Sequence, residues 1–164
     1  MTIELYYGRK HQDIMTQANA ADAVRAVVEY CAAHYGTLYF GSGETLKLIQ
    51  SRIAGGGYAA GGASLLDESD FTAANLNRAE KGSGDSEVMI HELVHQWWGL
   101  GNMFDIPEPD SPWSAEGLTV YTTYRIVKEL YGEEYARTHY IDQWQQEVDD
   151  YYLCLLYTSP SPRD

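Results

Sequence analysis

Apolar and polar residues in the first part of the chain follow two different periods. Thr2–Tyr7 alternates between the two kinds and is rich in β-forming residues, which predicts a short strand. Thr45–Ile53 and Ala63–Leu66 are predicted as two more strands. From Thr16 to Tyr35 the apolar residues recur at helical spacing, and Gly36 stands where a glycine commonly ends a helix.

The second half of the chain is patterned for helices. Apolar residues at helical spacing predict Glu87–Trp98, Ser114–Tyr131 and Glu133–Leu153, with glycines after the first two. Leu100–Pro112 contains three prolines and is predicted as a loop. These elements predict one α+β domain, mostly helical, with a small strand region near the N-terminus.

The Gly-rich segment Gly55–Gly62 lies between two of the predicted strands. A Gly-rich loop can cradle phosphate, but the spacing GxxxxGK[ST] is missing and no lysine follows. We therefore predict a loop that needs positive φ angles or close backbone approach.

Composition narrows the class of protein. The chain has 164 residues, enough for one domain, and 45% of them are hydrophobic, as in ordinary globular proteins. A formal net charge of −13 argues against binding to nucleic acid. No apolar run is long enough to span a bilayer, and Met1–Lys10 has no signal-peptide pattern. Localisation stays open, with a cytoplasmic or a membrane-associated longer parent protein both possible.

The last eleven residues, Cys154–Asp164, resemble the in-frame translation of a sequencing adaptor. The alternative is a natural Ser/Pro-rich tail. With the adaptor interpretation, residues 1–153 are a partial catalytic domain that continues further in the parent protein, and residues 1–10 are interpreted as the end of a preceding β domain. Cys31 is then the only native cysteine, which excludes an internal disulfide, and its place on an apolar stripe predicts a core residue.

The run His91-Glu92-Leu93-Val94-His95 is the motif that carries chemistry. Histidines at positions i and i+4 project from one face of a helix, so their imidazoles can share one metal ion. Glu92 lies beside them and can reach a water molecule at that metal without being a ligand. The alternative is a pair of histidines that are merely hydrogen-bonded within a packed helix.

A catalytic zinc site usually takes three protein ligands and leaves one position open. Glu116 is the best third candidate, because it begins the next predicted helix and an antiparallel helix pair would place it opposite the histidines. His139 is the competing candidate. The alternative role for Glu116 is an acidic first-turn residue that interacts with the helix dipole.

HELVHQWWG (His91–Gly99) and WSAEGL (Trp113–Leu118) resemble the gluzincin peptidases of the aminopeptidase N type, the membrane alanyl aminopeptidase family. The resemblance covers nearly all of Lys10–Leu153. It implies a thermolysin-like catalytic domain, one Zn²⁺ per chain, zinc-dependent peptide hydrolysis and a peptide as substrate. It further implies that His91, His95 and Glu116 bind the zinc and that Glu92 is the general base.

The chain departs from this family at the motif G-x-M-E-N, whose glutamate binds the free amino terminus of the substrate. The Gly-rich segment aligns with it, and Ala59 then stands at the position of that glutamate. We still expect Gly57, Ala59, Gly61 and Gly62 to form a wall of the substrate cleft. Exopeptidase specificity is therefore left open, and Glu44 and Glu68 are the nearest replacements for the missing carboxylate.

The resemblance places the tyrosine that stabilises the transition state well beyond Leu153, and Tyr121 and Tyr124 lie too close to Glu116 to replace it. Thr119 and Thr123 share the face of Glu116, and either orient the histidines or only pack between helices. Two alternative functions remain open: an inactive zinc-binding module, and a zinc hydrolase acting on lipidic epoxides. The intact Glu92 argues against the first alternative, because zinc binding alone does not need it.

Overall fold

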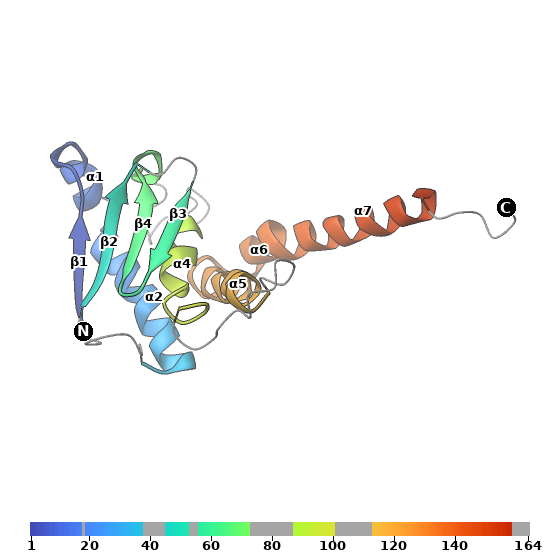
Figure 1. Cartoon of the computed structure of the whole chain (residues 1–164), viewed down its shortest axis with the longest axis horizontal. Helices are drawn as coiled ribbons and strands as arrows, with labels where there is room; N and C mark the ends of the chain where they lie inside the picture. Colours follow the sequence, from blue (N-terminus) through green and yellow to red (C-terminus); the bar gives the residue numbers. More distant parts are fainter. Residues whose placement is uncertain (18, 38–44, 53–55, 73–86, 101–112, 159–164) are drawn as a thin grey trace, which may run out of the picture.

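A small sheet forms one side of the molecule, and helices cover one of its faces and extend beyond it (Figure 1). The computed structural model describes residues 1–17, 19–37, 45–52, 56–72, 87–100 and 113–158. The sheet has four strands in the order β1-β2-β4-β3. Their bounds are Thr2–Tyr6 for β1, Thr45–Ser51 for β2, Gly57–Ala60 for β3 and Ala63–Asp67 for β4.

The first three strands in this spatial order are parallel, and β3 is antiparallel to β4. A parallel pair needs a long crossover, and the helices between β1 and β2 provide it. The alternation seen in the sequence has a clear cause in the structure. Leu46, Leu48 and Leu66 are fully buried against the helices, whereas their neighbours along the strands are only partly buried.

The prediction of a loop at Gly55–Gly62 was wrong in its central part. Residues Gly57–Ala60 form β3, which pairs with β4 in the register Ala60 to Ala63, so that only Gly61 and Gly62 form the turn. Gly62 has a φ of +76°, which glycine adopts without strain. The strand was missed because it contains only small residues and one tyrosine, so it carries no alternating pattern.

The helical region before β2 is broken once. We predicted one helix from Thr16 to Tyr35, but the structure has α1 (Gln12–Gln17) and α2 (Ala20–Tyr35). Asn19, between them, has a φ of +51°, a left-handed conformation that interrupts a helix. Cys31 is completely buried on α2, which confirms the prediction of a core residue.

The predicted helix Glu87–Trp98 is shorter in the structure, where α4 covers Glu87–Val94 and hydrogen-bonded turns follow. Glu116 lies in a wide helical turn, η3 (Trp113–Gly117), which leads into α5 (Leu118–Tyr131). The predicted loop at residues 100–112 lies, apart from Leu100, outside the described residues.

The predicted helix Glu133–Leu153 is divided into α6 (Glu133–Ala136), η4 (Arg137–Ile141) and α7 (Asp142–Thr158). Figure 1 shows α7 extending away from the rest of the molecule. The helix continues past Leu153, because no proline occurs before Pro160 to stop it.

The main core lies between the sheet, α2, α4 and α5. The largest fully buried side chain is that of Trp97, whose indole N–H donates to the carbonyl oxygen of Gly36 at 2.8 Å. Within the described part of the chain, no helix combines the length and the apolar character required to cross a bilayer. The architecture confirms the mostly helical α+β prediction, and α4 contacts both β3 and α5.

Candidate metal centre

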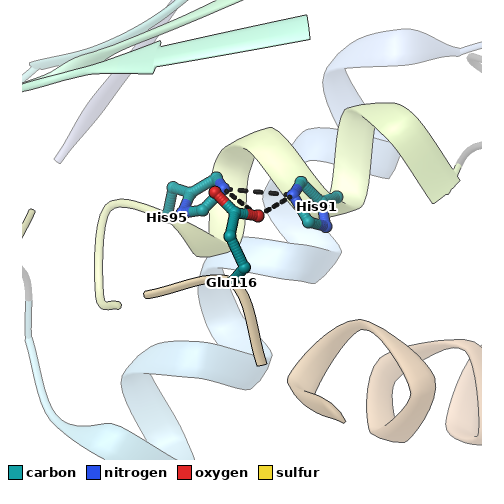
Figure 2. Close-up of side chains that lie close together, drawn as sticks. All are labelled: His91, His95 and Glu116. Carbon is teal, nitrogen blue, oxygen red and sulfur yellow. Dashed lines mark hydrogen bonds and ion pairs between the residues drawn. The ribbon is translucent and has the colours of Figure 1, made fainter. Parts of the chain in front are cut away.

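Three side chains from two elements converge on one point (Figure 2). His91 Nε2 lies 3.0 Å from His95 Nε2, and Glu116 Oε2 lies 3.2 Å from the first nitrogen and 3.4 Å from the second. Within the described ranges, these residues form the one group of His, Cys, Asp or Glu side chains placed closely enough to hold a metal ion.

The spacing of these donor atoms fits a tetrahedral metal ion. Ligand atoms about 2.0–2.1 Å from a zinc ion and related by tetrahedral angles lie roughly 3.3 Å from one another. The three observed separations, from 3.0 to 3.4 Å, lie close to this value. Two imidazoles and one carboxylate are also the donor set of several catalytic zinc sites.

The histidine spacing is produced locally. The amide of His95 donates to the carbonyl oxygen of His91 at 3.2 Å, so the helical register continues through the residue that follows α4. The two imidazoles therefore lie one turn apart on the same face. Burial lowers the pKa of His91, and the neighbouring His95 adds to this effect, which favours the neutral imidazole that ligates metals.

His95 is oriented through its second ring nitrogen. Nδ1 lies 3.1 Å from the carbonyl oxygen of Trp98, which can only accept, so Nδ1 carries the proton and Nε2 presents a lone pair to the centre. Thr119 Oγ1 lies 3.3 Å from the same nitrogen. Of the two threonines considered from sequence, Thr119 thus reaches the histidine, whereas Thr123 donates to the carbonyl oxygen of Thr119 within α5.

Gly99 allows η3 to approach the end of α4. It has a φ of +87°, and a Cβ atom there would lie 2.9 Å from the Cβ atom of Ala115, the residue before Glu116. Any side chain at this position would push η3 away from the histidines. The sequence pattern identified Gly99 only as the end of a helix and did not reveal this second role.

Glu92 is almost buried, with 7% of its surface exposed, and it lies next to the centre. Burial raises the pKa of its carboxyl group to about 7, and the Glu116 carboxylate contributes to the rise. β3 passes directly over this side chain: a Cβ atom on Gly57 would lie 2.2 Å from Glu92 Cγ and 2.7 Å from Oε1.

Two cavities adjoin His91 and Glu92 and share Gly57 as a lining residue. The first has a volume of about 290 Å³ and is lined by the metal centre together with Tyr58 and Ala59 of β3. The second, of about 430 Å³, is lined by Val88, Val120 and Tyr140 among others. His91 and Glu92 therefore lie between two neighbouring cavities.

The remaining candidates are distributed as follows. His139 lies apart from the centre, where Nδ1 is 2.9 Å from the carbonyl oxygen of Tyr135 and the ring stacks on that tyrosine. Glu68 forms an ion pair with Lys10 and is not among the residues that line the cavity at the centre, and Glu44 lies outside the described residues. Ala59 lines the first cavity, and its role toward a substrate stays a prediction.

Gly61 and Gly62 form the hairpin turn and are not among the residues that line the two cavities. Tyr121 and Tyr124 are also absent from both linings, and Tyr121 is 47% exposed. Sequence reasoning missed Gln96, whose buried amide connects α4 to the hairpin. The signal that could have identified it was a polar residue placed directly after His95 and before two tryptophans, Trp97 and Trp98.

Two histidines one helical turn apart, a carboxylate from the next helical segment and a buried glutamate beside them are the arrangement found in metallopeptidases. Comparison with known proteins then gives the family. Residues 20–152 match the model of the peptidase family M1 domain. Because this match covers more than half of the chain, the chain belongs to peptidase family M1.

Individual relatives agree with the family. Leucine aminopeptidase 2 of Emericella nidulans is 35% identical over 75 residues, which cover 46% of this chain and 12% of that protein. Probable aminopeptidase 1 of Sulfurisphaera tokodaii is 27% identical over 123 residues, which cover 74% of this chain and 15% of that protein. A leukotriene A-4 hydrolase homolog of Botryotinia fuckeliana is 37% identical over 70 residues, covering 41% and 10%. The matches thus span a small part of each relative.

Proposed function

We propose that this chain contains the catalytic centre of a zinc-dependent peptidase with a thermolysin-like, gluzincin arrangement. The observation that carries the proposal is the convergence of His91 Nε2, His95 Nε2 and Glu116 Oε2 within hydrogen-bond distance of one another, next to the buried Glu92. His91, His95 and Glu116 hold one zinc ion per chain. A bound zinc ion supplies Lewis acidity toward water and toward the carbonyl group of the substrate.

Glu92 acts as the general base. Its carboxylate accepts a proton from the water molecule that attacks the peptide carbonyl carbon, and it then donates this proton to the departing amine nitrogen. Its buried position beside Gly57 keeps the carboxylate in one orientation and limits its access to bulk water. His95 is kept in the tautomer suited to metal binding by the carbonyl oxygen of Trp98.

The substrate lies along β3. This strand is at one end of the sheet order and has β4 as its partner on one side. An extended peptide can add to such a strand through main-chain hydrogen bonds, with alternate side chains entering pockets. Residues Gly57, Tyr58 and Ala59 face the same cavity as the metal ligands, so this position brings a peptide bond close to Glu92.

Metal analysis tests the ligand set. We expect one zinc ion per parent chain, and large losses in His91→Ala and Glu116→Ala, because three ligands are the usual minimum of a catalytic zinc site. His139→Ala is the matched control, since His139 is stacked on Tyr135 away from the centre. Full zinc retention in Glu116→Ala, or loss in the His139 variant, would contradict the assignment.

Glu92→Gln separates binding from catalysis. The amide has the same shape but cannot accept the proton of the attacking water, so we expect zinc retention and a loss of peptide hydrolysis of about 10²-fold or more. The measurement uses a protein extended to the length of the relatives. Near-normal turnover of the variant would exclude Glu92 as the base.

A second candidate function is the hydrolysis of a lipidic epoxide. It is favoured by the similarity to a leukotriene A-4 hydrolase homolog and by the partly apolar second cavity. Parallel assays on peptide and epoxide substrates distinguish the two. An inactive zinc-binding module would bind the metal and hydrolyse neither substrate, although such a module has no need for the buried Glu92.

A further inference from the structure

We infer that Gln96 is a positioning residue that keeps the hairpin β3–β4 in register with Glu92 and the metal ligands. The carboxamide of Gln96 reaches the turn of the hairpin and uses all of its hydrogen-bonding groups there. Gln96 Oε1 accepts from the backbone N–H of Gly62 at 2.8 Å. Nε2 donates to the carbonyl oxygens of Ala60 at 2.9 Å and Ala63 at 3.1 Å.

This contact is fully enclosed. Gln96 is only 1% exposed, and it comes directly after His95 in the chain. Removing a hydrogen-bond partner from a buried amide lowers the stability of the protein considerably, because water cannot replace the missing hydrogen bond. The turn after α4 therefore carries His95, a proposed metal ligand, and is hydrogen-bonded to the β3–β4 hairpin through Gln96.

Two further contacts complete the attachment. Ser64 Oγ on β4 donates to the carbonyl oxygen of Glu92 at 2.8 Å, and both residues are buried. At the other end of β3, Gly57 lies against the side chain of Glu92. Strand β3 is thus held at Ala60 by Gln96 and rests at Gly57 on the proposed base, with the cavity-lining Tyr58 and Ala59 between these two points.

The consequence concerns the substrate more than the metal. The hydrogen bonds of the Gln96 side chain go to the hairpin, so we expect its loss to leave the proposed zinc ligands in place. The strand along which we place the peptide would lose its fixed distance from Glu92, and this step of the inference rests on the proposed function. A displacement of about 1 Å at a reacting bond can reduce the rate roughly 10²-fold.

The variant Gln96→Met tests the inference, since methionine fills a similar volume without the three hydrogen bonds. Thr122→Val is the matched control. This substitution removes the 2.9 Å hydrogen bond that the indole N–H of Trp98 donates to the buried Thr122 on α5. Trp98 lies on the same turn as Gln96, and this hydrogen bond does not involve the hairpin. Both variants are compared with the parent chain for zinc content, amide hydrogen exchange and peptide hydrolysis.

We expect Gln96→Met to keep its zinc and to lose protection at the Gly62 amide by about tenfold, as the loss of a buried hydrogen bond predicts. The Lys47 amide, which donates to the carbonyl oxygen of Gly62, should follow it. In a protein extended to the length of the relatives, kcat/KM should fall roughly 10- to 100-fold. Thr122→Val should change neither quantity by more than about threefold.

Equal exchange and equal kcat/KM in the two variants would overturn the inference, because Gln96 would then contribute only to stability. The parent chain provides a test that needs no variant. If Gln96 holds the hairpin, the Gly62 amide should exchange its hydrogen as slowly as the amides of α4, and zinc should slow the exchange of both. Rapid exchange at Gly62 would overturn the inference. If the unsubstituted protein, extended to the length of the relatives, shows no peptide hydrolysis, the proposed function is wrong. The exchange data still decide the role of Gln96.

Discussion

Gly57 lies where β3 passes over the side chain of Glu92, and it has no room for a larger residue. A Cβ atom would come within 2.2 Å of Glu92 Cγ and 2.6 Å of Cδ. The nearest atoms belong to a nearly buried side chain, so they cannot swing freely into solvent. The identity of one residue on the sheet therefore decides the orientation of the proposed base on a helix.

We predict that Gly57→Ala lowers stability by about 1–3 kcal/mol, the usual cost of overpacking a filled site. In the protein extended to the length of its relatives, hydrolysis should fall with zinc content unchanged, because Glu92 must rotate away. Thermal denaturation and metal analysis measure the two effects. Gly8→Ala is the control, since a Cβ atom there meets Gln50 only at an ordinary 3.5 Å. Equal behaviour of both variants would contradict the prediction.

Among the elements, β3 is the strand along which we propose that the substrate binds. Ala59 lines the cavity beside the candidate metal centre, and the two carboxylates in that lining are the proposed base Glu92 and the proposed ligand Glu116. Glu68, one of the two proposed replacements, is paired with Lys10. Within the described lining of this first cavity, a free amine of a substrate would therefore meet no carboxylate other than Glu92 and Glu116, whereas Glu87 lines the second cavity.

We predict that blocking the amino terminus of a peptide reduces cleavage only modestly in the extended protein. The measurement compares kcat/KM for matched free and acetylated peptides. A glutamate that binds the free amine of a substrate makes a charge-assisted hydrogen bond worth about 1.5–3 kcal/mol. With the neutral Ala59 at that position this hydrogen bond is missing, so acetylation of the amine has little to remove. A strict requirement for the free amine would show that a residue outside the described ranges, such as Glu44, supplies the missing charge.

Helix α7 packs little on the rest of the molecule. Trp144 lies within 5.6 Å of both Tyr124 and Tyr140, measured between ring centroids. Every other described side chain of α7 is exposed, including Tyr151 and Tyr152 at 62% each. The contribution of this helix to stability is therefore concentrated in its first turn.

We predict that deletion of residues 154–164 changes neither the melting temperature nor the zinc content of this chain. Deletion of residues 142–164 is the control, and it should lower the melting temperature because it removes Trp144 from its aromatic partners. Differential scanning calorimetry distinguishes the two truncations. A marked loss of stability in the shorter truncation would mean that the tail packs on the domain.

For the molecule as a whole, the metal centre is incompletely covered by the described residues. The Glu116 side chain is 54% exposed and Trp113, three residues before it, is 63% exposed. The matched relatives are much longer, since the aligned regions cover only 12% to 15% of the first two. Exclusion of water and a donor for the developing oxyanion are needed for efficient hydrolysis.

We predict that the 164-residue chain binds zinc but hydrolyses peptides far more slowly than a protein extended to the length of these relatives. The absence of one oxyanion donor alone costs about 10²–10³ in rate. The comparison is made at equal zinc occupancy with the same peptide. Comparable rates would contradict the prediction and would mean that a residue within these 164 supplies the donor.

The sequence alone determined the parts of this protein that depend on neighbours along the chain. The spacing of His91 and His95 sets their imidazoles one turn apart in any helix, and the periodicity of α2 and α5 marks their buried faces. Glu116 lies beside the two histidines in the structure, and its role as a ligand stays a proposal. The mostly helical class followed from the same local patterns.

Only the tertiary structure decided which distant residues meet. β3 carries too little side-chain pattern to be recognised, and its pairing with β4 makes it a strand. Gln96 becomes important because the hairpin turn lies within hydrogen-bond reach, and Gly57 and Gly99 because another segment occupies the space of their missing side chains. Contacts of this kind arise from close packing between elements, and no periodicity along the chain encodes them.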